Sequence, residues 1–503
     1  MPKKLAVFCD GTWNDLRTEH LTNVARLAKC VAQVDPVTRM QQIVYYDEGV
    51  GVSSNISKGT DELVKISGGA FGRGLDRKIE AAYRFIVMNY EPDDEIFVFG
   101  FSRGAYTARS LCGLIRKCGI IRRDSFHMVP KAMENYRNEL HPGSPEMIQF
   151  RRDFSHPRSS GPEDDVWVTE KLERRVAEHS GRDDSTVEIP PQRYPAPFPD
   201  ENRRAWLFQH RKAHSYRMMF LGVWDTVGSL GIPLRFGWLL GFLNEKYKFH
   251  DTRISSLHSS VRHAVAIEED RRVFDAATMA NIDELNSEWA EANAKRGRGW
   301  NVVDHTAANF VPYNHRPYQQ VWFPGGHGAV GGGNPEPGLP NATLLWIAEG
   351  AAWAGLAFSQ DQRSELALAA VKADPYAAWR IDKKGNPKSK NAFDLLGWIG
   401  GRKLRRGPDR LEEVGMTARL RWCNSTKKWR PKNLRPLSAM PCPPGSLPAA
   451  PPGYPTAAGV PDPACYPLFG VAVQAGDGKV SAAGEEDTTV RLPIFNAKRD
   501  GGP

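Results

Sequence analysis

The feature that most constrains this chain is a short apolar strand that runs directly into a Gly-x-Ser-x-Gly motif. Residues 96–99 are all apolar, the motif occupies residues 100–104, and a helix is expected over residues 103–118. A sharp turn between a strand and a helix needs small residues two positions before and after its centre, because larger ones would clash with the backbone. Such a turn would expose Ser102 above a sheet as a nucleophile; the alternative is an ordinary strand-to-helix turn.

Short apolar strands alternate with helical segments, and this alternation predicts a parallel sheet. The expected strands are residues 5–8, 43–46, 96–99, 218–223 and 320–323. The expected helices are residues 21–34, 75–90, 103–118, 255–271 and 343–357. We therefore expect an α/β protein with an α/β-hydrolase-like, mostly parallel sheet flanked by helices, with insertions and a Pro-rich C-terminal region.

Composition divides the chain into a catalytic domain and C-terminal segments. The α/β-hydrolase catalytic domain is predicted over residues 1–360, with an insertion at about residues 124–216 that is rich in charge and proline. A basic C-terminal extension follows over residues 361–440, and residues 441–503 form a Pro-rich tail. We expect the sheet to be complete by residue 360.

A serine hydroxyl needs a histidine to take its proton and a carboxylate to orient that histidine. In α/β-hydrolases both follow the serine, in the order aspartate and then histidine. Asp225 comes directly after the strand at residues 218–223, and His327 lies in a Gly-rich loop after the strand at residues 320–323. We therefore predict a triad of Ser102, Asp225 and His327. The alternatives are a cap or turn role for Asp225 and a phosphate-cradling role for the Gly-rich loop.

The oxyanion of an acyl-transfer reaction needs backbone N–H donors. One comes from the residue after the nucleophile, here Arg103, at the start of a helix. Another comes from a loop after an early strand, where Gly11 and Thr12 are the candidates. The alternative is that this loop is only a turn stabilised by the Asp10 side chain.

Composition also excludes several classes of function. Hydrophobic residues make up 41% of the chain, and the mean hydropathy of −0.48 excludes a polytopic membrane protein. The formal net charge of +9 comes from arginines and lysines that are spread widely, without a nucleic-acid-binding motif, so we expect no nucleic acid partner. The seven scattered cysteines indicate neither a disulfide framework nor a zinc site, and we expect no metal and no cofactor.

Two short aromatic-rich stretches are candidates for contact with a membrane. Residues 236–243 and 392–399 are too short to span a bilayer, so they are lids or interfacial anchors, or else buried core helices. Trp238 and Trp398 are the candidate lipid-interface residues, with peripheral membrane contact as the consequence. Residues 1–10 meet a charge before an apolar run of sufficient length forms, so we expect no signal peptide and a cytoplasmic protein as synthesised.

Four motifs in order resemble one known family. They lie at residues 8–14, 100–105, 223–228 and 323–327. They resemble the family called domain of unknown function 2235, which supplies the catalytic domain of a group of type VI secretion phospholipase effectors. Residues 263–271 also resemble a helix that the family has between the acid and the base. Over residues 5–360 the resemblance implies an α/β-hydrolase fold, a Ser-Asp-His triad and phospholipase A or related esterase activity on membrane lipids.

The resemblance also implies partners, and the chain departs from the family at one place. A lipid or ester substrate, a secretion-system component and an immunity protein are the expected partners, with delivery to the periplasm of a target cell. Residues 328–329 are Gly-Ala where the family usually has Ser-Asp, which removes polar groups next to the base. The alternatives to a lipolytic esterase are a soluble esterase, thioesterase or amidase on a small or polymeric metabolite, and a non-catalytic binding module.

Overall fold

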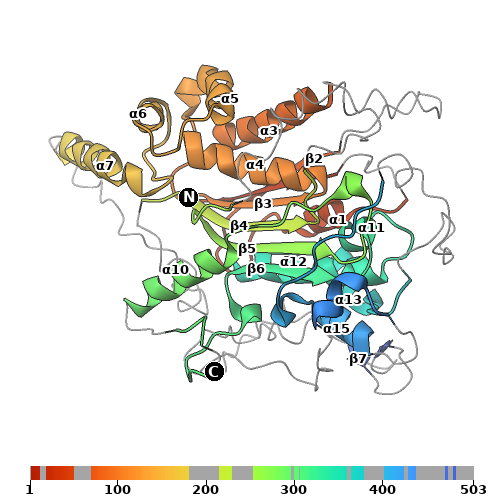
Figure 1. The fold of residues 1–503 in the computed structure, drawn as a ribbon. Helices are drawn as coiled ribbons and strands as arrows, with labels where there is room; N and C mark the ends of the chain where they lie inside the picture. Colours follow the sequence, from red (N-terminus) through yellow and green to blue (C-terminus); the bar gives the residue numbers. More distant parts are fainter. Residues whose placement is uncertain are drawn as a thin grey trace, which may run out of the picture.

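Six parallel strands form the central sheet, with helices on both of its faces (Figure 1). The strand order is β2-β1-β3-β4-β5-β6, and every neighbouring pair is parallel. The strands are β1 (Lys4–Cys9), β2 (Gln42–Asp47), β3 (Glu95–Phe101), β4 (Arg217–Trp224), β5 (His258–Ala266) and β6 (Tyr318–Phe323). The predicted fold class, an α/β-hydrolase-like sheet flanked by helices, is confirmed.

The computed structural model describes ten stretches of the chain. They are residues 2–11, 19–49, 70–180, 214–228, 253–295, 300–304, 306–359, 364–378, 401–423 and 429–437. It also describes the backbone of a small antiparallel pair, β7 (Val471–Val473) and β8 (Val480–Ala482). The predicted residues Thr12, Trp238 and Trp398 lie outside the described residues.

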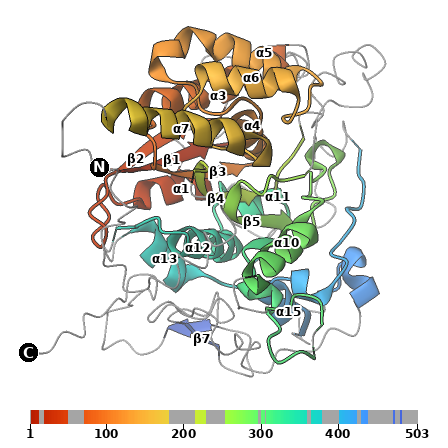
Figure 2. The same cartoon turned by 90° about the vertical axis from the view of Figure 1, so that its left-hand side faces the viewer.

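Two layers of helices cover the sheet. Helices α3 and α4 pack on one face, and α1 and α12 pack on the opposite face (Figure 2). The α-helices are α1 (Asn23–Cys30), α3 (Ala70–Asn89), α4 (Arg103–Cys118), α5 (Val129–Arg137), α6 (Pro145–Phe154), α7 (Asp165–Ser180), α10 (Ile282–Ala294), α11 (His327–Gly331), α12 (Gly338–Trp353), α13 (Glu365–Lys372) and α15 (Met416–Cys423). Short 3-10 turns are η1 (Arg123–Met128), η2 (Pro162–Asp164), η4 (Arg272–Phe274), η5 (Tyr313–His315), η6 (Leu411–Glu413) and η7 (Lys432–Leu437).

Strand β5 corrects the helix predicted at residues 255–271. Each of its residues is buried, between β4 and β6. Two of its polar side chains are paired with neighbouring elements. Arg262 donates to Glu349 on α12 over 3.0 Å, and His263 hydrogen bonds Gln320 on β6 over 3.0 Å. A strand that is covered on both faces need not alternate between apolar and polar residues, so its spacing was mistaken for that of a helix. The helix that the family resemblance implied at residues 263–271 is also wrong, because residues 263–266 belong to β5.

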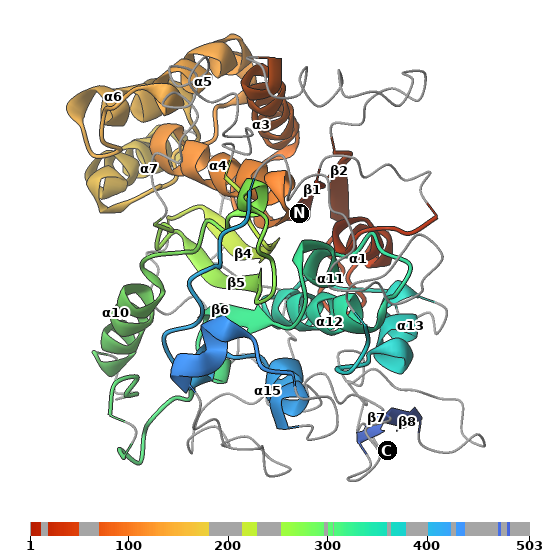
Figure 3. The ribbon, with the colours of Figure 1, turned by 45° about the vertical axis from the view of Figure 1, so that its right-hand side comes forward.

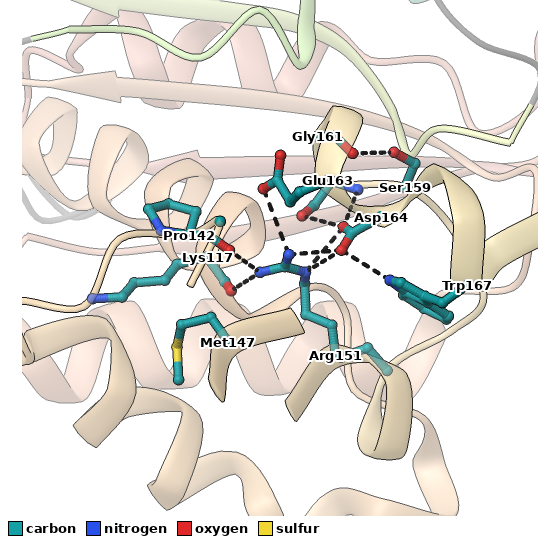
Figure 4. Close-up of polar contacts among 12 residues, drawn as sticks. Lys117, Pro142, Met147, Arg151, Ser159, Gly161, Glu163, Asp164 and Trp167 are labelled. Atoms are coloured by element: carbon teal, nitrogen blue, oxygen red, sulfur yellow. Dashed lines mark hydrogen bonds and ion pairs between the residues drawn. The ribbon is translucent and has the colours of Figure 1, made fainter. Parts of the chain in front are cut away.

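The predicted insertion contains the helices α5, α6 and α7, of which α5 and α6 pack beside α4. At their centre, Arg151 donates from Nε and Nη2 to Asp164 Oδ1 over 2.9 and 2.6 Å (Figure 4). The Nη1 atom of the same side chain donates to the carbonyl oxygens of Lys117 and Pro142, over 2.8 Å in each case. Asp164 also accepts a hydrogen bond from Trp167 Nε1 over 2.9 Å. This buried network fastens the insertion to the end of α4.

Residues 401–423 and 429–437 pack against the sheet beside β6, shown in blue in Figure 3. Val414 forms an isolated bridge with Trp322 on β6. A second apolar cluster joins this segment to β5 and β6 and consists of Val265, Ile267, Trp322, Val414, Ala418, Trp422, Trp429 and Leu434. The predicted domain boundaries stay predictions, but residues well beyond position 360 contribute to the structure around this edge of the sheet.

One cysteine takes part in a disulfide bond. Cys423, at the end of α15, is disulfide-bonded, whereas the sequence indicated no disulfide framework. An odd and irregularly spaced set of cysteines still allows a single bridge. In the described part of the chain, no helix has both the length and the apolar character that crossing a membrane requires.

Replacing Asp164 with alanine should destabilise the protein, because the buried Arg151 guanidinium would lose its nearest carboxylate and keep Glu163 Oε1 at 3.5 Å. Removing one partner of a buried ion pair costs about 3–5 kcal/mol of unfolding free energy. Urea unfolding of the full chain measures this loss. The matched control is Asp153→Ala, an exposed aspartate on α6, which should leave the unfolding free energy nearly unchanged. Equal unfolding curves for the two variants would contradict the role of this network.

Candidate active site

A strained turn joins β3 to α4 and carries Ser102. The strand ends at Phe101 and the helix begins at Arg103, so Ser102 alone forms the turn, with φ of 60° and ψ of −121°. A non-glycine residue at positive φ is uncommon and costs about 1–3 kcal/mol, and such strain clusters at functional sites. The Ser102 N–H donates to Trp224 O over 3.0 Å, and the Val227 N–H donates to Ser102 O over 3.3 Å. The turn has the geometry expected of a nucleophile elbow.

Two glycines permit this turn. A Cβ atom at Gly100 would lie 2.4 Å from the carbonyl oxygen of Gly104, and one at Gly104 would lie 2.0 Å from the carbonyl oxygen of Cys9. Both clashes are with backbone atoms, which cannot rotate away, so each position requires glycine. The second contact also means that the start of α4 packs directly on the end of β1, next to the loop that holds Gly11.

Ser102, His327 and Asp225 form a continuous chain of hydrogen bonds. Ser102 Oγ lies 2.7 Å from His327 Nε2, and His327 Nδ1 lies 2.5 Å from Asp225 Oδ2. A carboxylate can only accept, so His327 Nδ1 carries a hydrogen and Nε2 is free to accept the serine hydroxyl. The structure therefore brings the three predicted residues together from the ends of β3 and β4 and the start of α11. That is the arrangement a serine nucleophile requires.

The Asp225 carboxylate is fully buried and receives several hydrogen bonds. Its Oδ1 accepts the Ala266 N–H at the end of β5 over 2.9 Å. Arg405 makes a two-pronged ion pair with it, from Nη1 to Oδ1 over 2.6 Å and from Nη2 to Oδ2 over 3.0 Å. Burial alone would raise the pKa of Asp225, but the Arg405 charge and the His327 hydrogen bond outweigh it, so the pKa lies well below its usual range.

Arg405 was not among the predicted site residues. It lies in the basic extension predicted over residues 361–440, where several other arginines occur. Its side chain is 3% exposed, whereas the neighbouring Arg406 side chain is 84% exposed. Nothing in the local sequence distinguishes the buried arginine from the exposed one, because the difference arises from contacts with residues far away in the chain.

Two aromatic rings hold the imidazole of His327. The ring of Phe274 stacks on it with centroids 4.6 Å apart and planes at 19°, and the ring of Phe101 lies at the same distance with planes at 31°. The backbone N–H of His327 donates to Glu269 Oε2 over 3.0 Å. Burial would raise the pKa of Glu269, but Arg271 outweighs it and the pKa of Glu269 is lowered. His327 is thus held by aromatic contacts to its ring and by a hydrogen bond from its backbone N–H.

The glycines after His327 have packing roles. A Cβ atom at Gly331 would lie 2.0 Å from the ring of Phe101, and Gly332 has a φ of +82°. Small residues are therefore required in this loop because it packs against β3 and because its backbone adopts a positive φ. The phosphate-cradling alternative is therefore not needed to explain them.

The predicted oxyanion donors differ in their surroundings. The Gly11 N–H donates to Asp10 Oδ1 over 2.6 Å, and the other Asp10 oxygen accepts from Thr22 over 2.5 Å and from Tyr46 over 2.7 Å. This is the Asp-stabilised turn that the sequence left as the alternative. Arg103 opens α4, where the first N–H groups of a helix have no partner within it. The oxyanion roles of Gly11, Thr12 and Arg103 stay predictions.

The described residues include no group of three or more histidine, cysteine, aspartate or glutamate side chains arranged to hold a metal ion.

The family can be named from a comparison with known proteins. Residues 3–350 match the family model described as the type VI secretion phospholipase effector Tle1-like catalytic domain. The chain belongs to this family. The match confirms the resemblance drawn from the four sequence motifs. It ends before the segment that contains Arg405.

The individual proteins that match this chain have low sequence identity or cover only part of it. The Saccharomyces cerevisiae protein named Uncharacterized protein YEL023C is 30% identical over 160 residues, which cover 29% of this chain and 22% of the yeast protein. A structure titled as the Tle1 effector bound to the VgrG spike of the type 6 secretion system has 15% identity and a TM-score of 0.29, with 66% of this chain and 51% of that chain covered. An uncharacterized Pseudomonas aeruginosa protein has 14% identity and a TM-score of 0.31, with 71% and 46% covered.

The chain spans about half the length of these two structures and less than a quarter of the yeast protein. Because both TM-scores are below 0.5, neither structure defines the geometry of this site.

Replacing Gly104 with alanine should disrupt the turn, because the added Cβ would meet the backbone of Cys9. The expected loss of unfolding free energy is about 3 kcal/mol, at the upper end for overpacked sites. The matched control on α4 is Gly113→Ala, whose Cβ would lie 3.2 Å from the edge of the Tyr136 ring, which can adjust. Thermal unfolding of both variants measures the difference. A Gly104→Ala protein as stable as the control would contradict the close contact between α4 and β1.

Proposed function

We propose that this chain is a carboxylic ester hydrolase that cleaves membrane phospholipids through a Ser102, His327 and Asp225 triad. The observation that carries the proposal is the continuous hydrogen-bonded chain from Ser102 Oγ through His327 to Asp225 Oδ2. Membership of the Tle1-like phospholipase effector family supports a lipid ester as substrate. Phospholipase A activity is the specific form proposed.

The reaction proceeds through an acyl-enzyme intermediate. Ser102 Oγ attacks the ester carbonyl carbon while its proton passes to His327 Nε2, and Asp225 stabilises the imidazolium at Nδ1. The tetrahedral oxyanion receives hydrogen bonds from the Arg103 N–H and from an N–H of the loop after β1, once Gly11 releases Asp10. Collapse of the intermediate breaks the ester C–O bond, and His327 returns the proton to the leaving alcohol.

Water then completes the cycle. A water molecule attacks the acyl-enzyme carbonyl, and its proton passes to His327 Nε2. The second tetrahedral intermediate collapses, the C–O bond to Ser102 breaks, and His327 returns the proton to Ser102 Oγ. The products are a free fatty acid and a lysophospholipid.

Delivery and partners belong to the same proposal. A Tle1-like effector would be made in the cytoplasm, associate with a component of the secretion system and reach the periplasm of a target cell, where phospholipid is available. An immunity protein would protect the producing cell. The net charge of +9 favours attraction to anionic lipid surfaces. Family membership is the support for these assignments.

Ser102→Ala should abolish ester hydrolysis while the fold remains intact. Loss of the nucleophile should lower kcat by about 10³-fold or more, because only binding and oxyanion contributions remain. Labelling with a fluorophosphonate probe should also disappear. Thermal unfolding serves as the control for folding and should be close to that of the parent. Activity within about tenfold of the parent on the same ester would remove Ser102 from the mechanism.

Interfacial contact separates a phospholipase from a soluble esterase. Replacing both Trp238 and Trp398 with serine should reduce hydrolysis of anionic phospholipid vesicles but spare a short soluble ester, because indole rings favour the headgroup boundary. The matched control replaces both with phenylalanine. Added salt should weaken vesicle hydrolysis by the parent, since exposed charges are screened over about 8 Å at physiological ionic strength. No loss on either substrate would favour a soluble esterase, and equal loss on both would indicate core residues.

A further inference from the structure

The segment that contains Arg405 is held on both sides by backbone hydrogen bonds. On one side, the Arg272 N–H donates to Gly401 O over 3.0 Å and the Lys403 N–H donates to Asp270 O over 2.7 Å. On the other side, the Gly415 N–H donates to Trp322 O over 2.9 Å.

Apolar packing anchors the residues that follow Arg405. Val414, Ala418 and Trp422 belong to the cluster that packs against β5 and β6. The backbone at Arg405 therefore has a defined place next to the ends of β5 and β6.

The Arg405 side chain links the parts of the site that hold the imidazole. It contacts both oxygens of Asp225, one of which, Oδ2, also receives the His327 N–H. The same guanidinium donates to the carbonyl oxygen of Ala266 over 3.0 Å and to that of Phe274, whose ring stacks on His327. One side chain thus fixes the rotation of the carboxylate and holds the residue that packs on the base.

A guanidinium is suited to this position. Its planar fork matches a carboxylate through two parallel hydrogen bonds, and it stays charged when buried. Without it, the Ala266 N–H and the imidazole would be the remaining partners of the buried Asp225 carboxylate among the residues that the structure describes. A buried carboxylate that lacks a neighbouring cation gains a proton more easily, or its charge favours a proton on the neighbouring imidazole. In either case the Asp225–His327 pair would hold an additional proton, whereas the mechanism requires His327 to accept the proton of Ser102.

We propose that Arg405 is a positioning residue for the hydrolytic reaction, which orients the Asp225 carboxylate toward His327 and keeps the acid–base pair ready to accept the serine proton. The inference rests on the proposed function. Arg405 does not touch Ser102 in the described contacts and acts through Asp225. The working site therefore extends beyond residues 3–350, to which the family match is confined, into the segment at residues 401–423.

Other charged and titratable groups surround Arg405, and their states decide how a pH profile is interpreted. They are Asp225, His327, Glu269, Arg271, Asp275 and His263. Burial and the charge of Arg109 lower the pKa of His263 to about 3, so this imidazole is neutral throughout the range of an assay. The pKa of Glu269 is lowered in its contact with Arg271, so it remains ionised. The acid limb of the profile then reports on the Asp225–His327 pair.

The test compares Arg405→Met with Arg406→Met in the full chain on a short soluble ester. Arg406 is the matched control, because it is the next residue and pairs with Asp409 at the surface. For Arg405→Met we expect kcat at pH 7 to fall roughly 10-fold to 100-fold with KM nearly unchanged, the size of loss known for partners that orient the ligands of a metal site. The acid limb should move upward by about one pH unit or more. Loss of a cation beside the carboxyl of a coupled pair shifts the apparent pKa of that pair by about this amount.

Arg405→Lys separates charge from geometry. Lysine keeps the positive charge but cannot contact both oxygens in parallel, so kcat should fall about 5-fold to 10-fold while the acid limb stays near that of the parent. If Arg405→Met fails to show a cooperative thermal transition, this variant decides the question. A folded Arg405→Met protein, or in its place a folded Arg405→Lys protein, with the kcat and pH profile of the parent would overturn the proposal.

Ser102→Ala in the same assay distinguishes failure of the proposed hydrolytic function from failure of the proposed role of Arg405. If Ser102→Ala keeps activity within about tenfold of the parent, the proposed function itself fails. If Ser102→Ala is inactive while Arg405→Met matches Arg406→Met at every pH, the hydrolytic function stands and only the role of Arg405 is overturned.

Discussion

The buried charge of Asp225 is the constraint on which the rest of this site depends. Taking an ionised carboxylate out of water costs several kcal/mol unless hydrogen bonds and an opposite charge replace the lost hydration. Here the replacement comes from Ala266 at the end of β5, His327 at the start of α11 and Arg405 in the C-terminal segment. Three segments that are far apart in the chain must converge for one side chain to remain ionised. The stability of this part of the fold and the chemistry of the site have the same physical origin.

Much of the fold and the geometry around Ser102 could be predicted from the sequence, because the determinants of the turn are local. An apolar strand, a helix and glycines at positions 100 and 104 all lie within residues 96–118, and each has a steric reason that acts at short range. Asp225 and His327 were found by a different rule. Both follow strands of a parallel sheet, and the carboxyl ends of such strands lie at one edge. Five of the six strands were predicted for similar reasons.

The remainder depends on contacts that the local sequence does not encode. Arg262 and His263 of β5 are buried with the distant partners Glu349 and Gln320, and these partners cannot be recognised from the local sequence, which predicts a helix there. Arg405 is 180 residues away from Asp225 along the chain and resembles its exposed neighbours. Gly11 lies in the predicted loop, yet its N–H is engaged by Asp10. In each case the deciding partner is distant or is a side chain whose orientation only the folded structure defines.

The distance between His327 and Arg405 has a consequence for the order in which a new chain matures. On a ribosome that adds about 5–20 residues per second, the 78 residues from His327 to Arg405 take roughly 4–16 seconds to synthesise. During that interval the three residues of the proposed triad have all been made, but the cation that matches the buried carboxylate has not. A nascent chain would therefore hold an incomplete charge arrangement until translation has passed position 405. Maturation of the site is a late event of biosynthesis, set by the linear order of the residues.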